Sequence, residues 1–118
     1  MPITKTVFCT LQVAGLHCWA DCPLPEVQYL RDPHRHVFHI TAHVRVSHND
    51  RDVEFIVLKG AIEQYLRTKY FNEYAKLHDF GGQSCEMIAA ELIDAFDLCQ
   101  CEVNEDGENG SILYNTAE

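Results

Sequence analysis

The sequence predicts an α+β fold with the element order ββααββ, in which an antiparallel β-sheet carries two helices on one face. Polar and apolar residues alternate over 6–17 and again over 34–46, as in half-buried strands. Apolar residues recur at helical spacing over roughly 57–70 and 84–96. With 118 residues, 47 % of them hydrophobic, the chain is long enough to form one domain, residues 1–118, around a real core.

The first predicted strand, residues 6–17, has an apolar face that ends at a histidine. Val7 and Cys9 begin this face, and His17 closes it with the same parity. Residues 18–33 contain three prolines and show no hydrophobic period, which predicts a loop.

The second predicted strand, residues 34–46, contains four histidines. Parity places His34 and His36 on the apolar face, at its margin and pointing inward. The other two, His39 and His43, belong to the wetter face, which is either solvated or in contact with another subunit. The four histidines therefore divide into two pairs with different surroundings.

The middle of the chain predicts the two helices and their connections. Residues 47–52 (SHNDRD) form a turn, and a helix follows over roughly 57–70. A loop containing HDFGGQ leads to a second helix over roughly 84–96, for which Ser84 is a suitable N-cap.

The last predicted strands are residues 98–105 and 111–114, joined by the turn DGENG. Glu105 ends an apolar face, as His17 does on the first strand. Nothing in the sequence covers the edges of the sheet, so we expect the edges to pair with neighbouring subunits.

The charge of the chain excludes some classes of partner. Lys and Arg number 9 against 18 Asp and Glu, for a net charge of −9. Because such a surface repels phosphate groups, we expect no nucleic-acid partner and no anionic membrane partner. The N-terminus has no signal-peptide pattern and no segment is apolar enough to span a membrane, so we expect a cytoplasmic protein.

The six cysteines are expected to be mostly reduced in that compartment. Cys18-x-x-x-Cys22 and Cys99-x-Cys101 suggest a zinc ribbon, but neither has the C-x-x-C spacing of one. Buried cysteines that act as small hydrophobic residues are the favoured interpretation.

Three histidines form the predicted metal site. His34 and His36 lie at i and i+2 on one strand face, so their backbones are roughly 6.6 Å apart and their side chains can converge on one ion. His17 ends the neighbouring strand with the same inward parity and supplies a third nitrogen. A site with three imidazoles and an open fourth position is typical of catalytic zinc.

Six short segments, taken in order, carry a resemblance to a known family. They are His17, residues 34–38 (HRHVF), residues 54–59 (EFIVLK), residues 84–89 (SCEMIA), residues 103–105 (VNE) and Tyr114. The series resembles the 6-pyruvoyl- and 6-carboxy-tetrahydropterin synthase family over nearly the whole chain. There a histidine ends strand one, H-x-H-x-[FY] opens strand two, [D/E]F-x-x-L-K and [ST]-x-E-x-x-A begin the helices, and V-x-E precedes a final tyrosine.

The resemblance implies the tunnelling fold (T-fold), in which subunits join their sheets into a trimeric barrel that often stacks into a hexamer, with active sites at subunit interfaces. It implies Zn²⁺ on His17, His34 and His36. It also implies that Glu105 holds the amino-pyrimidinone edge of a pterin through charge-assisted bidentate hydrogen bonds. Without the family, Glu105 would be read as an exposed turn residue. Glu86 matches a second pocket position, and equally suits a helix N-terminus.

The sequence departs from the family at its proton-transfer residues. Leu30 stands where the family has a catalytic cysteine four residues before H-x-H. The family's Leu-Asp-His motif aligns with residues 69–71 or 66–68, and neither segment preserves the Asp-His pair. His78 with Asp79, in a displaced and reversed order, is one substitute, with a surface role for His78 as the alternative. Cys22 or Glu26, in the loop before the histidine pair, is another.

These patterns predict a zinc-dependent protein that binds a pterin or a related purine-derived heterocycle and carries out an altered, lyase-type reaction. The loss of general acid–base groups, which typically contribute about 10²–10⁴-fold, argues against the standard reaction. A catalytically inactive binding or scaffold protein with a structural zinc is the alternative. A third interpretation is an unrelated small α+β domain with surface histidines.

Overall fold

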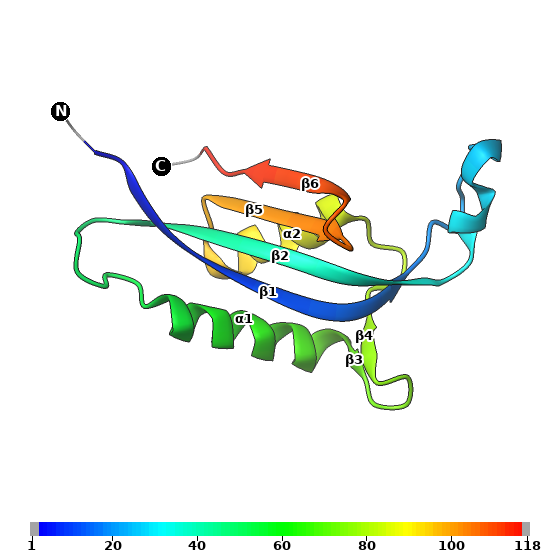
Figure 1. The fold of residues 1–118 in the computed structure, drawn as a ribbon, viewed down its shortest axis with the longest axis horizontal. Coiled ribbons are helices and arrows are strands. Elements are labelled where there is room, and N and C mark those ends of the chain that lie inside the picture. The colour runs from blue at the N-terminus through cyan, green and yellow to red at the C-terminus, as the bar shows by residue number, and fades with distance from the viewer. Residues whose placement is uncertain (1–2, 117–118) are drawn as a thin grey trace.

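The computed structural model describes residues 3–116 and shows an α+β protein with one six-stranded mixed sheet and three helices (Figure 1). The strand order is β3-β4-β1-β2-β5-β6. The elements, in chain order, are β1 (Lys5–His17), η1 (Pro25–Arg31), β2 (His34–Val46), α1 (Phe55–Tyr70), β3 (Phe71–Asn72), β4 (Leu77–Asp79), α2 (Cys85–Phe96), β5 (Gln100–Glu105) and β6 (Asn109–Tyr114).

The two long strands β1 and β2 form the centre of the sheet, and their alternating patterns are confirmed. They pair antiparallel along their whole length, with His17 directly opposite His34 and Gly15 opposite His36. Residues opposite one another in an antiparallel pair point to the same face. The register therefore places the predicted metal ligands on one face, at the end of the sheet where β1 stops.

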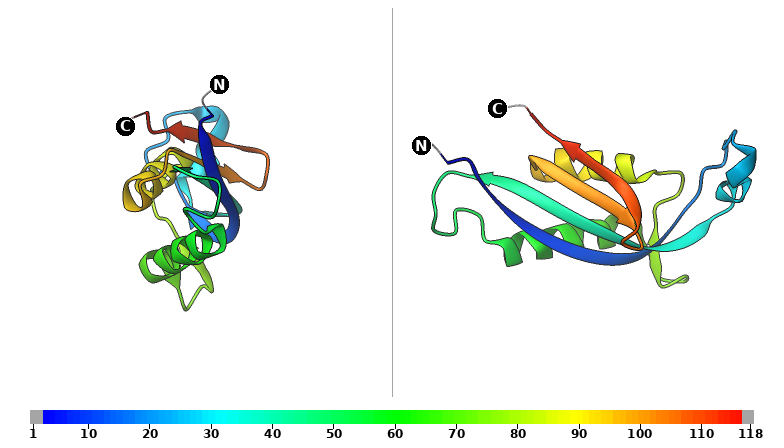
Figure 2. Two further views of the ribbon diagram at one scale, coloured as in Figure 1. Left: turned by 90° about the vertical axis from the view of Figure 1, so that its left-hand side faces the viewer. Right: turned by 45° about the horizontal axis from the view of Figure 1, so that its top comes forward.

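The two α-helices, α1 and α2, lie on the predicted apolar face of the sheet. Figure 2 shows α1 on the β1 side and α2 behind β5 and β6. The core between helices and sheet is formed by apolar side chains of the parity expected from the sequence. They include Cys9, Leu11, Phe38, Ile40, Ala42, Cys101 and Val103 from the strands, and Leu58, Ile62, Leu66, Ile88, Ala89 and Leu92 from the helices.

Side-chain caps determine where the helices begin. The carboxylate of Glu54 accepts hydrogen bonds from the backbone N–H groups of Ile56 and Val57, so α1 starts at Phe55, earlier than predicted. The hydroxyl of Ser84 accepts from the N–H of Met87, as expected for an N-cap of α2.

The sheet is mixed, so the prediction of a purely antiparallel sheet was wrong. Strand β4 runs parallel to β1, with Gly15 opposite His78, and β3 pairs antiparallel with β4. These strands lie in the segment predicted as a loop. They have only two and three residues, too few to show an alternation in the sequence. They form because β1 has backbone groups on its free side with which β4 can pair.

The segment predicted as a loop before β2 contains the short helix η1, which lies at the end of the molecule beyond the β1–β2 pair (Figure 1). Pro25 at its first turn favours a helical start, and the φ angle of Val27, −133°, interrupts it. Within residues 3–116, no helix has the length and apolar character needed to cross a membrane.

Candidate metal centre and pocket

The three predicted ligands come together at the end of the central strand pair. The imidazole of His17 lies 4.5 Å from that of His34 and 5.3 Å from that of His36, centroid to centroid, and the His34 and His36 rings are 5.0 Å apart. One nitrogen from each ring lies within 4.8 Å of the other two. The strand register makes this arrangement possible, because all three residues share one face.

Each of these imidazoles is oriented by a contact at Nδ1. His17 Nδ1 lies 2.9 Å from the carbonyl oxygen of Gln83, and His34 Nδ1 lies 2.9 Å from that of Asp32. A carbonyl oxygen only accepts, so Nδ1 is the protonated nitrogen in both rings. Such outer contacts determine the tautomer of metal-binding histidines and leave Nε2 as the ligand atom.

The remaining nitrogens have the character expected of a metal site. His17 Nε2 and His36 Nε2 are buried and make no hydrogen bond. Burial, and next to it the neighbouring imidazoles, lowers the pKa of His17 against the opposing effects of Gln83 and Glu105, so this ring is neutral near pH 7. Three imidazoles whose nitrogens converge are a donor set that suits zinc.

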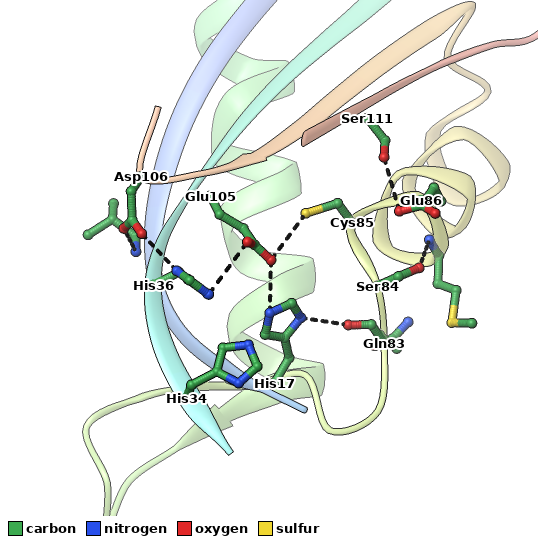
Figure 3. A network of polar contacts seen from close by, with 12 residues as sticks. His17, His34, His36, Gln83, Ser84, Cys85, Glu86, Glu105, Asp106 and Ser111 are labelled. Atoms are coloured by element: carbon green, nitrogen blue, oxygen red, sulfur yellow. Dashed lines mark hydrogen bonds and ion pairs between the residues drawn. The ribbon is translucent and has the colours of Figure 1, made fainter. Parts of the chain in front are cut away.

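Glu105 lies at the boundary between the histidine cluster and a pocket. One carboxylate oxygen is 2.9 Å from His17 Nε2 and the other is 3.5 Å from His36 Nε2, close contacts without the geometry of hydrogen bonds (Figure 3). Glu105 ends β5 opposite Phe38, two residues along β2 from His36. Its side chain is 26 % exposed, so it is available to a ligand in the pocket as well.

Asp106 is a site residue that the sequence interpretation missed. Its carboxylate contacts His36 Nδ1 at 2.7 Å and accepts a hydrogen bond from the backbone N–H of Val37 at 2.8 Å. These two contacts lower the pKa of Asp106. In the sequence, the Asp-Gly pair at residues 106–107 indicates only a turn. The positive φ at Asp106, +60°, brings the carboxylate back beside the strand.

A pocket of about 520 Å³ opens beside the histidines. Its lining comes from the end of β1 and the residues after it, from η1, the start of β2, the start of α2 with the loop before it, the end of β5 and the start of β6. The lining residues are His17, Cys18, Trp19, Leu30, His34, Gly82, Gln83, Ser84, Cys85, Glu86, Met87, Glu105, Asn109, Gly110 and Ser111. The two predicted substrate-binding residues are thus both in the lining, and the volume is within the range of small-molecule sites.

The loop that orients His17 is held by a polar cluster between the helices. The side-chain amide of Gln83 donates to Glu91, which also accepts from Tyr65, Tyr70 and Lys69. Burial disfavours the charge on Glu91, but these hydrogen bonds outweigh it and lower its pKa to about 2. No sequence signal marks Gln83, because its contact with His17 is made by a backbone oxygen.

The candidate proton-transfer residues lie outside the pocket lining. His78 is 9 % exposed and packs between the rings of Phe71 and Phe80, and burial lowers its pKa. Asp79 is exposed and accepts a hydrogen bond from the backbone N–H of Gly81. The structure does not bring this pair to the histidine cluster.

The loop residues considered as substitutes are also elsewhere. Cys22 is fully buried, with its sulfur near the carbonyl oxygens of Leu24 and Val27, and Glu26 is exposed on η1. Leu30, at the position of the family's cysteine, does line the pocket. Its side chain neither donates nor accepts a proton.

Cys85 is a thiol in the pocket that the sequence interpretation did not single out. Its sulfur lies 3.8 Å from a carboxylate oxygen of Glu105. Burial, followed by the charges of Glu105 and Glu86, raises the pKa of Cys85 to about 12. Near neutral pH this group is therefore a protonated thiol, which donates a weak hydrogen bond and does not act as a base.

Comparisons with known proteins leave the family open. No model of a known protein family matches the chain, and no curated protein matches it.

Proposed function

We propose that this chain is a zinc-dependent 6-pyruvoyl/6-carboxy-tetrahydropterin synthase-like protein of the tunnelling fold that binds a pterin or a related purine-derived heterocycle. The observation that carries the proposal is the convergence of three oriented imidazoles beside one carboxylate at a pocket. The order of six family-like segments along the sequence supports the same assignment.

Each site residue has a distinct role in this proposal. His17, His34 and His36 hold the ion, which supplies Lewis acidity toward a substrate oxygen. Glu105 accepts two parallel N–H donors from the amino-pyrimidinone edge of the ligand. Trp19, in the pocket lining, offers an apolar surface for a flat ring.

The proposed reaction is an altered, lyase-type one. The pocket has Leu30 where the family has its catalytic cysteine, and His78 and Cys22 lie outside the lining. The thiol of Cys85 stays protonated. The family's usual proton-transfer side chains are therefore absent from the described lining, while the groups proposed for metal and ring binding are together.

Metal analysis and calorimetry test the proposal. The full chain, purified without chelator, should contain close to one zinc per subunit and should bind neopterin or biopterin. The His34→Ala variant should lose zinc, whereas His48→Ala, in the exposed turn after β2, should retain it. A protein that contains no zinc and binds neither pterin would contradict the proposal.

A catalytically inactive binding or scaffold protein, with a structural zinc, is the second candidate. Leu30 in the place of the family's cysteine, and the absence of the Asp-His pair from the described pocket lining, favour it. Incubation with dihydroneopterin and with its triphosphate separates the candidates. Release of a cleaved side chain would exclude the inactive protein, and unchanged substrates would support it.

We also propose a cytoplasmic homotrimer or homohexamer in which the sites lie at subunit interfaces. The edge strands β3 and β6 offer unpaired backbone groups to neighbouring subunits. Native mass spectrometry distinguishes three subunits from six, and a monomer at micromolar concentration would contradict this assembly.

A further inference from the structure

The pocket is lined by carboxylates and has no cation of its own. Glu86 and Glu105 both belong to the lining, and Asp106 binds the far side of His36. Among residues 3–116, none of those that line the pocket is lysine or arginine. An anionic ligand would therefore meet negative groups of this chain around the metal site.

The start of α2 is a part of the lining that resembles an anion site, and it already carries acceptors of the chain itself. Helix N-termini attract phosphates through free N–H groups and the helix dipole. Here the Ser84 hydroxyl accepts from the N–H of Met87 at 3.2 Å. The carboxylate of Glu86 lies in the same first turn and accepts a hydrogen bond from the Ser111 hydroxyl at 3.0 Å.

Two cations near the pocket are already bound, and a third, Arg35, is exposed on the opposite face of β2 from His34 and His36. Arg31, which follows the lining residue Leu30, donates through Nε and Nη2 to the carbonyl oxygen of Cys22 at 2.9 and 2.7 Å. Lys69 donates to Glu91 at 2.7 Å. Neither is free to receive a phosphate group in this arrangement.

A bound divalent cation would not make the net charge of the pocket positive. Its two positive charges would lie near the carboxylates of Glu105 and Asp106, which contact the histidines, in a pocket that Glu86 also lines. The three carboxylates outnumber the charges on the ion. Within a pocket partly removed from water, these groups repel an anionic ligand more strongly than surface carboxylates would.

We infer that the pocket selects an unphosphorylated heterocycle, neutral or cationic, that presents hydrogen-bond donors to Glu105 and Glu86, and that it rejects phosphate esters. This inference rests on the proposed pterin site and narrows its substrate class. Donors on the ring edge pair with Glu105, and hydroxyl groups of a short side chain can pair with Glu86 beside Ser111.

Calorimetry with a matched pair of ligands tests the inference. The zinc-loaded full chain is titrated with 7,8-dihydroneopterin and with its triphosphate, which differ only in the phosphate groups. We expect the unphosphorylated ligand to bind at least about tenfold more tightly at low salt. The difference should shrink as salt is added, because screening weakens the repulsion.

Variants of Glu86 test whether the pocket itself causes the difference in affinity between the two ligands. Glu86→Gln should narrow the affinity ratio several-fold, and Glu86→Lys should raise the affinity for the triphosphate. Glu63→Gln, exposed on α1, should leave the ratio unchanged. Equal or tighter binding of the triphosphate would overturn the inference and leave the pterin site standing, whereas binding of neither ligand would instead remove the proposed function.

Discussion

His36 is held between two consecutive carboxylates, one on each ring nitrogen. Glu105 approaches Nε2 at 3.5 Å and Asp106 contacts Nδ1 at 2.7 Å. Consecutive strand residues normally point to opposite faces. Asp106 reaches the same ring because its φ of +60° ends the strand and returns the carboxylate toward Val37 and His36.

Asp106→Asn should weaken zinc binding by about 10–100-fold, because a charged partner at Nδ1 orients the imidazole and strengthens Nε2 as a donor. Asparagine tolerates the left-handed backbone, so the turn should persist. Competition with a chromophoric chelator measures the affinity. Asp52→Asn is the matched control, since Asp52 also accepts from a backbone N–H, that of Ser47, away from the pocket. Equal zinc affinity in both variants would leave Asp106 with a role in the turn alone.

Gly15 is required by the two aromatic rings beneath the histidines. A Cβ atom there would lie 2.8 Å from Phe80 and 2.9 Å from Phe38, and the Phe38 ring packs edge-on against His17 and His36. A side chain at this position would therefore disturb both the core and the orientation of the ligands.

Gly15→Ala should lower the free energy of unfolding by about 1–3 kcal/mol, the usual cost of overpacking. Gly60→Ala is the control, because a Cβ atom at this position on α1 would meet nothing within 4 Å. The control should stabilise the protein by up to about 1 kcal/mol through helix propensity. Urea unfolding measures both, and an unchanged midpoint for Gly15→Ala would contradict the packing argument.

At the scale of elements, Glu91 joins the two helices and the loop that orients His17. It accepts from Tyr65 and Lys69 at 2.7 Å and from Tyr70, all on α1, and from Gln83 at 3.2 Å. Burial of Tyr70, together with this carboxylate, raises the pKa of the tyrosine to about 12. The polar contact between the helices thus depends on one ionised group, beside the ring contact of Tyr65 with Phe96.

Glu91→Gln should destabilise the fold by about 1–3 kcal/mol near neutral pH, because charge-assisted hydrogen bonds are lost. The pKa of Glu91 is about 2 in the folded protein and near 4.5 when unfolded, so the unfolded chain binds more protons between these values. The stability difference between wild type and variant should be full above pH ~5 and should fall toward pH ~2. Urea titrations across this range measure it, and a difference independent of pH would contradict the assignment.

At the scale of the whole molecule, the histidine cluster joins segments that are far apart in the sequence. His17 and its partner Gln83 are 66 residues apart, and His36 and Asp106 are 70 apart. An ion at this point would link β1 to β2 and, through the partners of the histidines, to the loop before α2 and the turn after β5. Because the unfolded chain has no such preformed site, binding free energy becomes folding free energy.

Zinc at about 100 times its Kd should therefore stabilise the protein by about 2.7 kcal/mol and raise Tm by several degrees. Chelation should reverse the shift, and renewed zinc should restore it. Differential scanning fluorimetry follows both steps. The His17→Ala variant should show no zinc-dependent shift, and a wild-type Tm that is insensitive to zinc would contradict a metal that binds the folded state.

The sequence by itself determined the two long strands, both principal helices, the apolar face and the inward parity of His17, His34 and His36. These features follow from the local spacing of apolar residues, which repeats about every 3.6 residues in a helix and every two residues in a strand. The sequence also placed Glu105 at the end of an apolar face, which the register of β5 against β2 confirms.

Only the tertiary structure decided what surrounds those residues. The parallel pairing of β4 with β1 depends on an exposed edge, and it buries His78 away from the pocket. The partners of the imidazoles are two backbone carbonyls and a carboxylate from a distant turn. Such contacts have no local period in the sequence, because they arise when separate segments meet in space and every residue carries the same carbonyl group.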